Sequence, residues 1–130
     1  MKAWFGRFGL ALVVMAAIFL ASATPGSELP KFGIWDLLVK KGGHMLGYGL
    51  LAAAYWHALK KSPNAVRFTF LIAFCLTVLY AATDEWHQHF VSGRTPSFRD
   101  VCIDAAGGLI SLAFLRQLKN PRTNSSGTKH

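Results

Sequence analysis

Charged residues are scarce in this chain of 130 residues: they occupy 15% of the positions, and only six of them are acidic. A soluble domain carries about 25% charged residues, whereas hydrophobic residues make up 52% of this sequence. So little charge on so apolar a chain excludes an ordinary soluble domain. The composition predicts an integral membrane protein.

Cysteine is also rare, and the two that occur, Cys75 and Cys102, lie in different apolar segments. A disulfide between them is therefore not expected, and we interpret both as small packing residues. No spacing of His, Cys, Asp or Glu matches a zinc motif, so we expect neither a metal nor another cofactor. The 14 basic residues outnumber the acids. Because they are scattered between apolar runs, a nucleic-acid partner is not expected.

Four apolar runs reach about 17 residues, the length at which a helix can cross a bilayer. They cover about residues 8–24, 43–59, 66–83 and 100–116. The sequence therefore predicts an all-α fold, a four-helix transmembrane bundle formed by one membrane domain over residues 1–117. Residues 118–130 combine basic residues with Asn, Ser, Thr and Gly, and we expect them to form a disordered basic tail.

The first apolar run admits a second interpretation, a cleaved signal peptide. Lys2 and Arg7 form a basic start, an apolar stretch follows, and Ala21-Ser22-Ala23 fits the small residues of a cleavage site. In both interpretations the chain starts in the cytoplasm, and the residues after this run emerge on the other side of the membrane.

The distribution of charge predicts the orientation of the bundle, because short cytoplasmic loops are enriched in Lys and Arg. If both termini are cytoplasmic, nine of the 14 bases lie on that side: Lys2, Arg7, Lys60, Lys61, Arg67, Arg116, Lys119, Arg122 and Lys129. All six acids then fall on or near the outer side. The polar loop between the third and fourth helices, Asp84 to Asp100, is therefore expected to be extracytoplasmic.

Glycine and tryptophan have expected structural roles. Gly43 and Gly47 stand four apart in the second run, and Gly107 and Gly108 lie in the fourth. Small residues at such positions allow helices to approach closely, so we interpret them as packing residues. The four tryptophans lie near the ends of predicted spans, where an aromatic belt is expected without any further function.

Polar side chains recur at the outer ends of three spans, at spacings that place them on common helix faces. His44 and Tyr48 are four apart, and so are Asp100 and Asp104. An ionisable side chain that faces lipid costs a few kcal/mol, so such residues are candidates for a functional site. We expect one pocket lined by Lys41, His44, Tyr48, Asp84, Glu85, His87, Gln88, Arg94, Asp100 and Asp104.

Structural roles compete with this functional one. Ser97-x-x-Asp100 fits a capping box, in which Asp100 would only satisfy amide groups at the start of the fourth helix. Asp104 lies inside its apolar span, where no capping role exists, so we expect a partner such as His44, Lys41 or Arg94. A further interpretation makes the whole set a structural network that fixes the packing of the helices.

Two spaced motifs carry these polar residues: Lys41-x-x-His44-x-x-x-Tyr48 and Asp84-Glu85-x-x-Gln88-x-Phe90-x-x-Gly93-Arg94-x-x-Ser97-x-x-Asp100-x-x-x-Asp104-x-x-Gly107. Over about residues 36–111 the pattern resembles the VanZ-like family of small bacterial membrane proteins. The resemblance implies a multi-pass protein of the bacterial inner membrane with a cell-envelope role, since the founding member is associated with resistance to the glycopeptide teicoplanin. The family usually has Asn at the position of Asp104, so the resemblance implies an extra charge or proton here.

Two classes of function fit the predicted pocket. Arg94 and Arg99 flank the start of the fourth helix, where free amides and the helix dipole also favour anions. The first class is therefore binding of an anionic envelope lipid or lipid-linked precursor through its phosphate. The second is a membrane-embedded enzyme for hydrolysis or transfer on a lipid headgroup, with the catalytic candidates Asp84, Glu85, His44 and His87. The expected partners are membrane lipids, and the sequence leaves an oligomer open.

Overall fold

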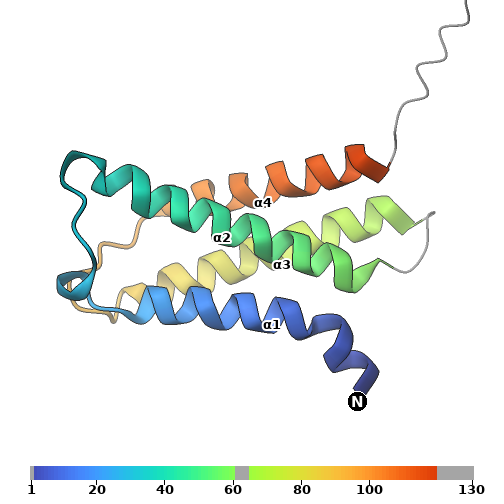
Figure 1. The fold of residues 1–130 in the computed structure, drawn as a ribbon, viewed down its shortest axis with the longest axis horizontal. Coiled ribbons are helices and arrows are strands. Elements are labelled where there is room, and N and C mark those ends of the chain that lie inside the picture. Colours follow the sequence, from blue (N-terminus) through green and yellow to red (C-terminus); the bar gives the residue numbers. More distant parts are fainter. Residues whose placement is uncertain (1, 61–64, 120–130) are drawn as a thin grey trace, which may run out of the picture.

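The structure, a computed structural model, describes residues 2–60 and 65–119. Over these residues the chain forms four α-helices and no strand, and consecutive α-helices run antiparallel (Figure 1). The α-helices are α1 (Lys2–Ala23), α2 (Asp36–Leu59), α3 (Val66–Gln88) and α4 (Phe98–Lys119), and two 3₁₀ turns, η1 (Gly26–Glu28) and η2 (Gly33–Trp35), connect α1 to α2. The predicted all-α fold is confirmed. The tail was predicted to begin at residue 118, but residues 118 and 119 belong to α4, and the rest of the tail lies outside the described residues.

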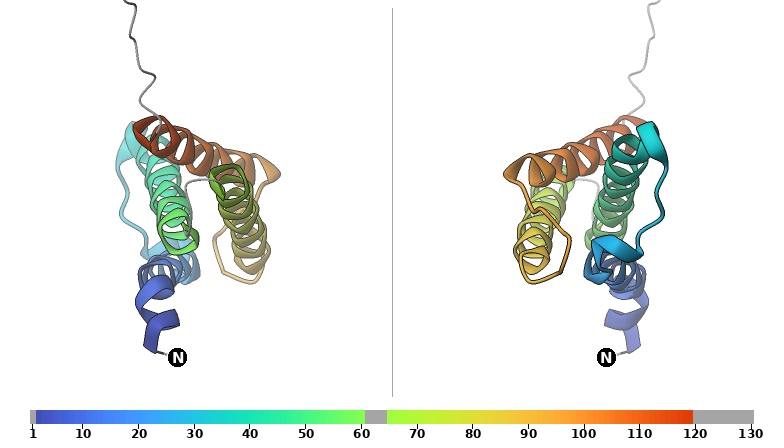
Figure 2. Two further views of the ribbon diagram at one scale, coloured as in Figure 1. Left: turned by 90° about the vertical axis from the view of Figure 1, so that its right-hand side faces the viewer. Right: turned by 90° about the vertical axis from the view of Figure 1, so that its left-hand side faces the viewer.

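Three of the helices in the described residues, α1, α3 and α4, are long and apolar enough to cross a membrane. Of the four predicted spans, α2 does not meet this criterion, because His44, His57 and its glycines and tyrosines lower its hydropathy. α2 contacts each of the other three α-helices and lies between α1 and α4 (Figure 2).

The outer surface of the bundle is apolar. Large hydrophobic side chains such as Val13, Leu46, Phe68, Leu79 and Ile110 are exposed on the outside of all four α-helices. A soluble monomer rarely exposes so much contiguous apolar surface. Together with the three candidate spans, this surface is that of a membrane protein. Cys75 and Cys102 are free and exposed on this surface, so the interpretation of both as small packing residues is wrong.

The core follows α2. Tyr48 and Leu51 of α2 and Leu112 of α4 are fully buried. The close approach of α2 and α4 requires glycine, because a Cβ atom at Gly107 would overlap the carbonyl group of Met45. The two helices therefore pack backbone against backbone beside a core of large side chains.

At the end of the bundle opposite the described ends of the chain, the α1–α2 and α3–α4 connections contact each other (Figure 1). The N–H of Gly26 donates to the carbonyl of Ser92 at 3.0 Å. Gly93 has a positive φ of 72°, which favours glycine, and a Cβ at Gly26 would overlap it. This contact brings the end of α1 beside the residues that precede α4.

Candidate functional site

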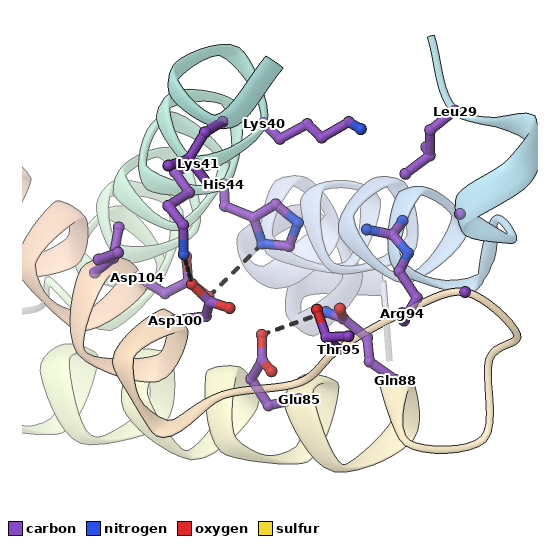
Figure 3. Close-up of a pocket in the computed structure, with 14 residues that line it drawn as sticks. Leu29, Lys40, Lys41, His44, Glu85, Gln88, Arg94, Thr95, Asp100 and Asp104 are labelled. Atoms are coloured by element: carbon purple, nitrogen blue, oxygen red, sulfur yellow. Dashed lines mark hydrogen bonds and ion pairs between the residues drawn. The ribbon is translucent and has the colours of Figure 1, made fainter. Parts of the chain in front are cut away.

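A polar cavity of about 250 Å³ opens where these two connections meet (Figure 3). Its lining comes from α2, α3, α4 and both connections. The lining residues that were predicted from the sequence are Lys41, His44, Glu85, Gln88, Arg94, Asp100 and Asp104, and Lys40 and Leu29 are among those that were not. We call this the polar cavity.

The two lysines of the polar cavity each pair with an acid. Lys41 on α2 forms an ion pair with Asp100 on α4, which links these helices at the mouth of the cavity. The Nζ atom of Lys40 lies 2.7 Å from a carboxylate oxygen of Asp36, one turn earlier on α2. Both pairs are partly exposed, and such pairs contribute only about 0–1 kcal/mol. Either lysine can therefore turn to another anion at little cost.

Arg94 binds the end of α1. Its Nε atom donates to the carbonyl of Thr24 at 3.1 Å, and its Nη2 atom donates to the carbonyl of Ala21 at 2.5 Å. The last carbonyls of a helix have no partner within the helix, so Arg94 caps α1. The same side chain lines the polar cavity. Arg99, which was expected to flank the anion site beside it, is exposed and does not line the cavity.

Glu85 has the amide-capping role that the capping-box pattern predicted for Asp100. The backbone N–H of Ser97 donates to Oε2 of Glu85 at 3.0 Å, and the hydroxyl of Ser97 accepts the N–H of Arg99 at 3.2 Å. A carboxylate of α3 therefore satisfies an amide just before α4. Asp100 is left free to pair with Lys41 inside the cavity.

His44 and Asp104 are neighbours in the depth of the polar cavity. The side chain of Asp104 is 1% exposed, and its Oδ2 atom lies 3.7 Å from Nδ1 of His44, which is beyond hydrogen-bond distance. Among the described residues neither carboxylate oxygen of Asp104 has a hydrogen-bond partner. His44 is thus the neighbour that the sequence predicted, but it leaves the hydrogen-bonding capacity of Asp104 unused.

A second polar group lies behind the cavity. The hydroxyl of Ser22, at the end of α1, donates to Oδ2 of Asp84 at 2.6 Å, and Nε2 of Gln88 lies 3.3 Å from the same oxygen. Ser22 is completely buried and Asp84 is nearly so. Gln88 reaches the polar cavity, whereas Asp84 does not line it. Asp84 therefore joins α1 to α3, and its predicted contact with the pocket is indirect.

An apolar cavity of about 310 Å³ adjoins the polar cavity. It lies at α1 and α2, where Ile18, Gly47 and Tyr48 form part of its lining. Leu29, Lys40, His44 and Arg94 line both cavities. The site as a whole therefore has a polar compartment and an apolar one that meet at shared side chains.

A family model for VanZ/LLP1 matches residues 5–119. The chain belongs to the VanZ/LLP1 family. Neither the search of curated proteins nor the search of solved structures found a match. The family match confirms the resemblance drawn from residues 36–111 and extends it over most of α1.

In this VanZ/LLP1 protein, most of the predicted pocket residues do come together, but three do not line the polar cavity. Tyr48 lines the apolar cavity, and Asp84 lies behind Gln88. His87 packs against Phe19 with the two rings tilted and their centroids 4.8 Å apart, and it lines neither cavity. His87 therefore does not join His44 as a potential acid or base.

The sequence prediction missed the contribution of α1. Ser22 and the carbonyls of Ala21 and Thr24 all bind predicted site residues. The only signal in the sequence was a polar Ser22 near the C-terminal end of an apolar run, which fits a cleavage site equally well. Among the described residues, no three His, Cys, Asp or Glu side chains lie close enough together to hold a metal ion.

Proposed function

We propose that the polar cavity binds the phosphate-bearing headgroup of an envelope lipid or lipid-linked precursor at the extracytoplasmic surface of the bacterial inner membrane. The observation that carries this proposal is the convergence of Lys40, Lys41 and Arg94 on one cavity. Phosphate is recognised by Lys and Arg through short charge-assisted hydrogen bonds. The ion pairs of the lysines are weak enough to be exchanged for a phosphate.

The adjoining apolar cavity supports an amphiphilic ligand. A headgroup in the polar cavity would have its hydrocarbon chain beside Ile18, Gly47 and Tyr48, because the two cavities share residues along their common border. The polar cavity, at about 250 Å³, is smaller than the roughly 300–1,000 Å³ of sites that enclose a whole drug-sized ligand. That size suits a headgroup whose chain remains outside.

The charge distribution supports the proposed orientation. The polar cavity lies where α1 and α3 end and α2 and α4 begin, and the opposite ends of these antiparallel helices carry Lys2, Arg7, Lys60, Arg67 and Arg116. Basic residues of this kind favour the cytoplasmic side. The cavity would then face the outer surface, where envelope precursors are used.

We expect Lys40→Gln and Lys41→Gln each to weaken binding of dihexanoyl phosphatidylglycerol by about 10- to 150-fold, because each removes a charged donor to phosphate worth about 1.5–3 kcal/mol. Isothermal titration of the detergent-solubilised protein measures this. Lys31→Gln is the matched control, since Lys31 is exposed and lines neither cavity. Equal affinity of the wild type for dihexanoylglycerol, which has no phosphate, would refute the proposal.

A hydrolase or transferase acting on the same headgroup is the second candidate. The observation that favours it is that His44 and Asp104, a potential acid and base 3.7 Å apart, both line the polar cavity. Incubation of the purified protein with phospholipid and mass spectrometry of the products tests it. This candidate requires headgroup release that His44→Gln abolishes, and an unaltered lipid after long incubation counts against it.

A further inference from the structure

We infer that the headgroup bound in the polar cavity carries a primary ammonium group as well as a phosphate, so that the ligand belongs to the aminophospholipid class. The inference rests on the proposed function and adds a second recognition element to it. Two features of the polar cavity lead to it: the separation of opposite charges across the cavity and the unused carboxylate of Asp104.

Apart from Lys41, which pairs with Asp100 on the acidic side, the charges that line the polar cavity are segregated. Lys40 of α2 and Arg94 lie on one side, and the carboxylates of Glu85, Asp100 and Asp104, which belong to α3 and α4, lie on the other (Figure 3). A purely anionic headgroup would be attracted by the first side and repelled by the second. A headgroup with a phosphate and an amine matches both sides.

Asp104 supplies the observation that points to a donor-rich group. Its side chain is 1% exposed, it lines the cavity, and neither of its oxygens has a hydrogen-bond partner among the described residues. Leaving a buried carboxylate without donors is costly. The neighbouring Nδ1 of His44 is too distant, at 3.7 Å, to satisfy it. A primary ammonium offers three N–H donors and a compensating charge.

Lys41 shows that the acidic side accepts a primary ammonium. Its Nζ atom is paired with Asp100, one turn before Asp104 on α4. Residues four apart share a helix face, so the two carboxylates flank one part of the cavity. A quaternary ammonium carries charge but no N–H donor, and it would leave Asp104 unsatisfied. The geometry therefore selects a primary amine over a choline-type group.

Three dihexanoyl phospholipids with identical chains separate these possibilities: phosphatidylethanolamine, phosphatidylcholine and phosphatidylglycerol. We expect the full-length protein in detergent to bind phosphatidylethanolamine about tenfold more tightly than the other two. In Asp104→Asn we expect affinity for phosphatidylethanolamine to fall to that for phosphatidylglycerol. Glu28→Gln, which changes an exposed acid that lines neither cavity, should keep the wild-type preference.

The outcomes distinguish the two proposals. Equal wild-type affinity for all three lipids would overturn the amine while leaving phosphate recognition intact. Failure to bind any of them would instead refute the proposed function. Because the wild-type comparison needs no substitution, the inference stays testable even if Asp104→Asn does not fold. A preference that survives in a folded Asp104→Asn protein would also overturn the role of this carboxylate.

Discussion

Gly107→Ala is expected to destabilise the bundle by about 1–3 kcal/mol, the usual cost of overpacking a core. The new Cβ would overlap the backbone carbonyl of Met45 and lie 2.9 Å from its Cγ atom. A flexible side chain could move away, but a helix carbonyl cannot move unless α2 and α4 separate. These two helices form the most extensive interface of the bundle. Thermal unfolding of the detergent-solubilised protein measures the effect.

Gly42→Ala is the matched control for this prediction. Gly42 lies in α2, and a Cβ there would meet nothing within 4 Å. Alanine is favoured over glycine in a helix by about 1 kcal/mol, so we expect unchanged or slightly increased stability. If Gly107→Ala unfolds at the same temperature as Gly42→Ala, the close contact between α2 and α4 is not present in the protein.

The glycines of α2 and α4 show how much of the helix packing could be predicted from the sequence. Spacing predicted that Gly43 and Gly47 serve close helix contact, yet a Cβ at Gly43 meets nothing within 4 Å and one at Gly47 meets only the side chain of Ile18. Gly107 and Gly108 do lie at tight contacts, as predicted. Small residues permit close approach, but the sequence does not say which faces meet, because that depends on the arrangement of all the helices.

The tryptophans give a second example. Trp4, Trp35 and Trp86 are more than half exposed, as an interfacial belt requires, but Trp56 is buried with 5% of its surface exposed. Trp56 lies near the end of α2 and belongs to the hydrophobic core. The fold class followed from hydrophobic run lengths, whereas the identity of the central helix required the tertiary contacts.

The candidate site was predictable to the extent that helical spacing fixes a common face. Asp100 and Asp104 line the polar cavity together, as their spacing implied. On α3 the same rule placed His87 with Asp84, but the structure separates them: Asp84 turns to Ser22, and His87 packs against Phe19. The sequence could not anticipate this because it gave no sign that α1 would pack beside α3 and bond to it.

Ser22→Ala is expected to cost about 1.5–3 kcal/mol of stability, the range for a hydrogen bond to a charged group. The substitution removes the 2.6 Å donor to Asp84 and leaves only the longer contact from Gln88. The carboxylate is too deeply buried for water to replace the lost donor. Thermal unfolding in detergent measures the loss, and Ser27→Ala, which truncates an exposed serine, should leave the midpoint unchanged.

This substitution also separates a structural network from a binding site. Ser22 lies behind the polar cavity and does not line it, so the folded Ser22→Ala protein should bind phospholipid as the wild type does. A loss of affinity without a loss of stability would contradict that assignment and place Asp84 in the binding machinery.

Cleavage after Ala23 would remove Ser22 together with the Ala21 carbonyl that Arg94 binds. Such a cleavage would therefore cost the protein at least the stability that Ser22→Ala is expected to lose.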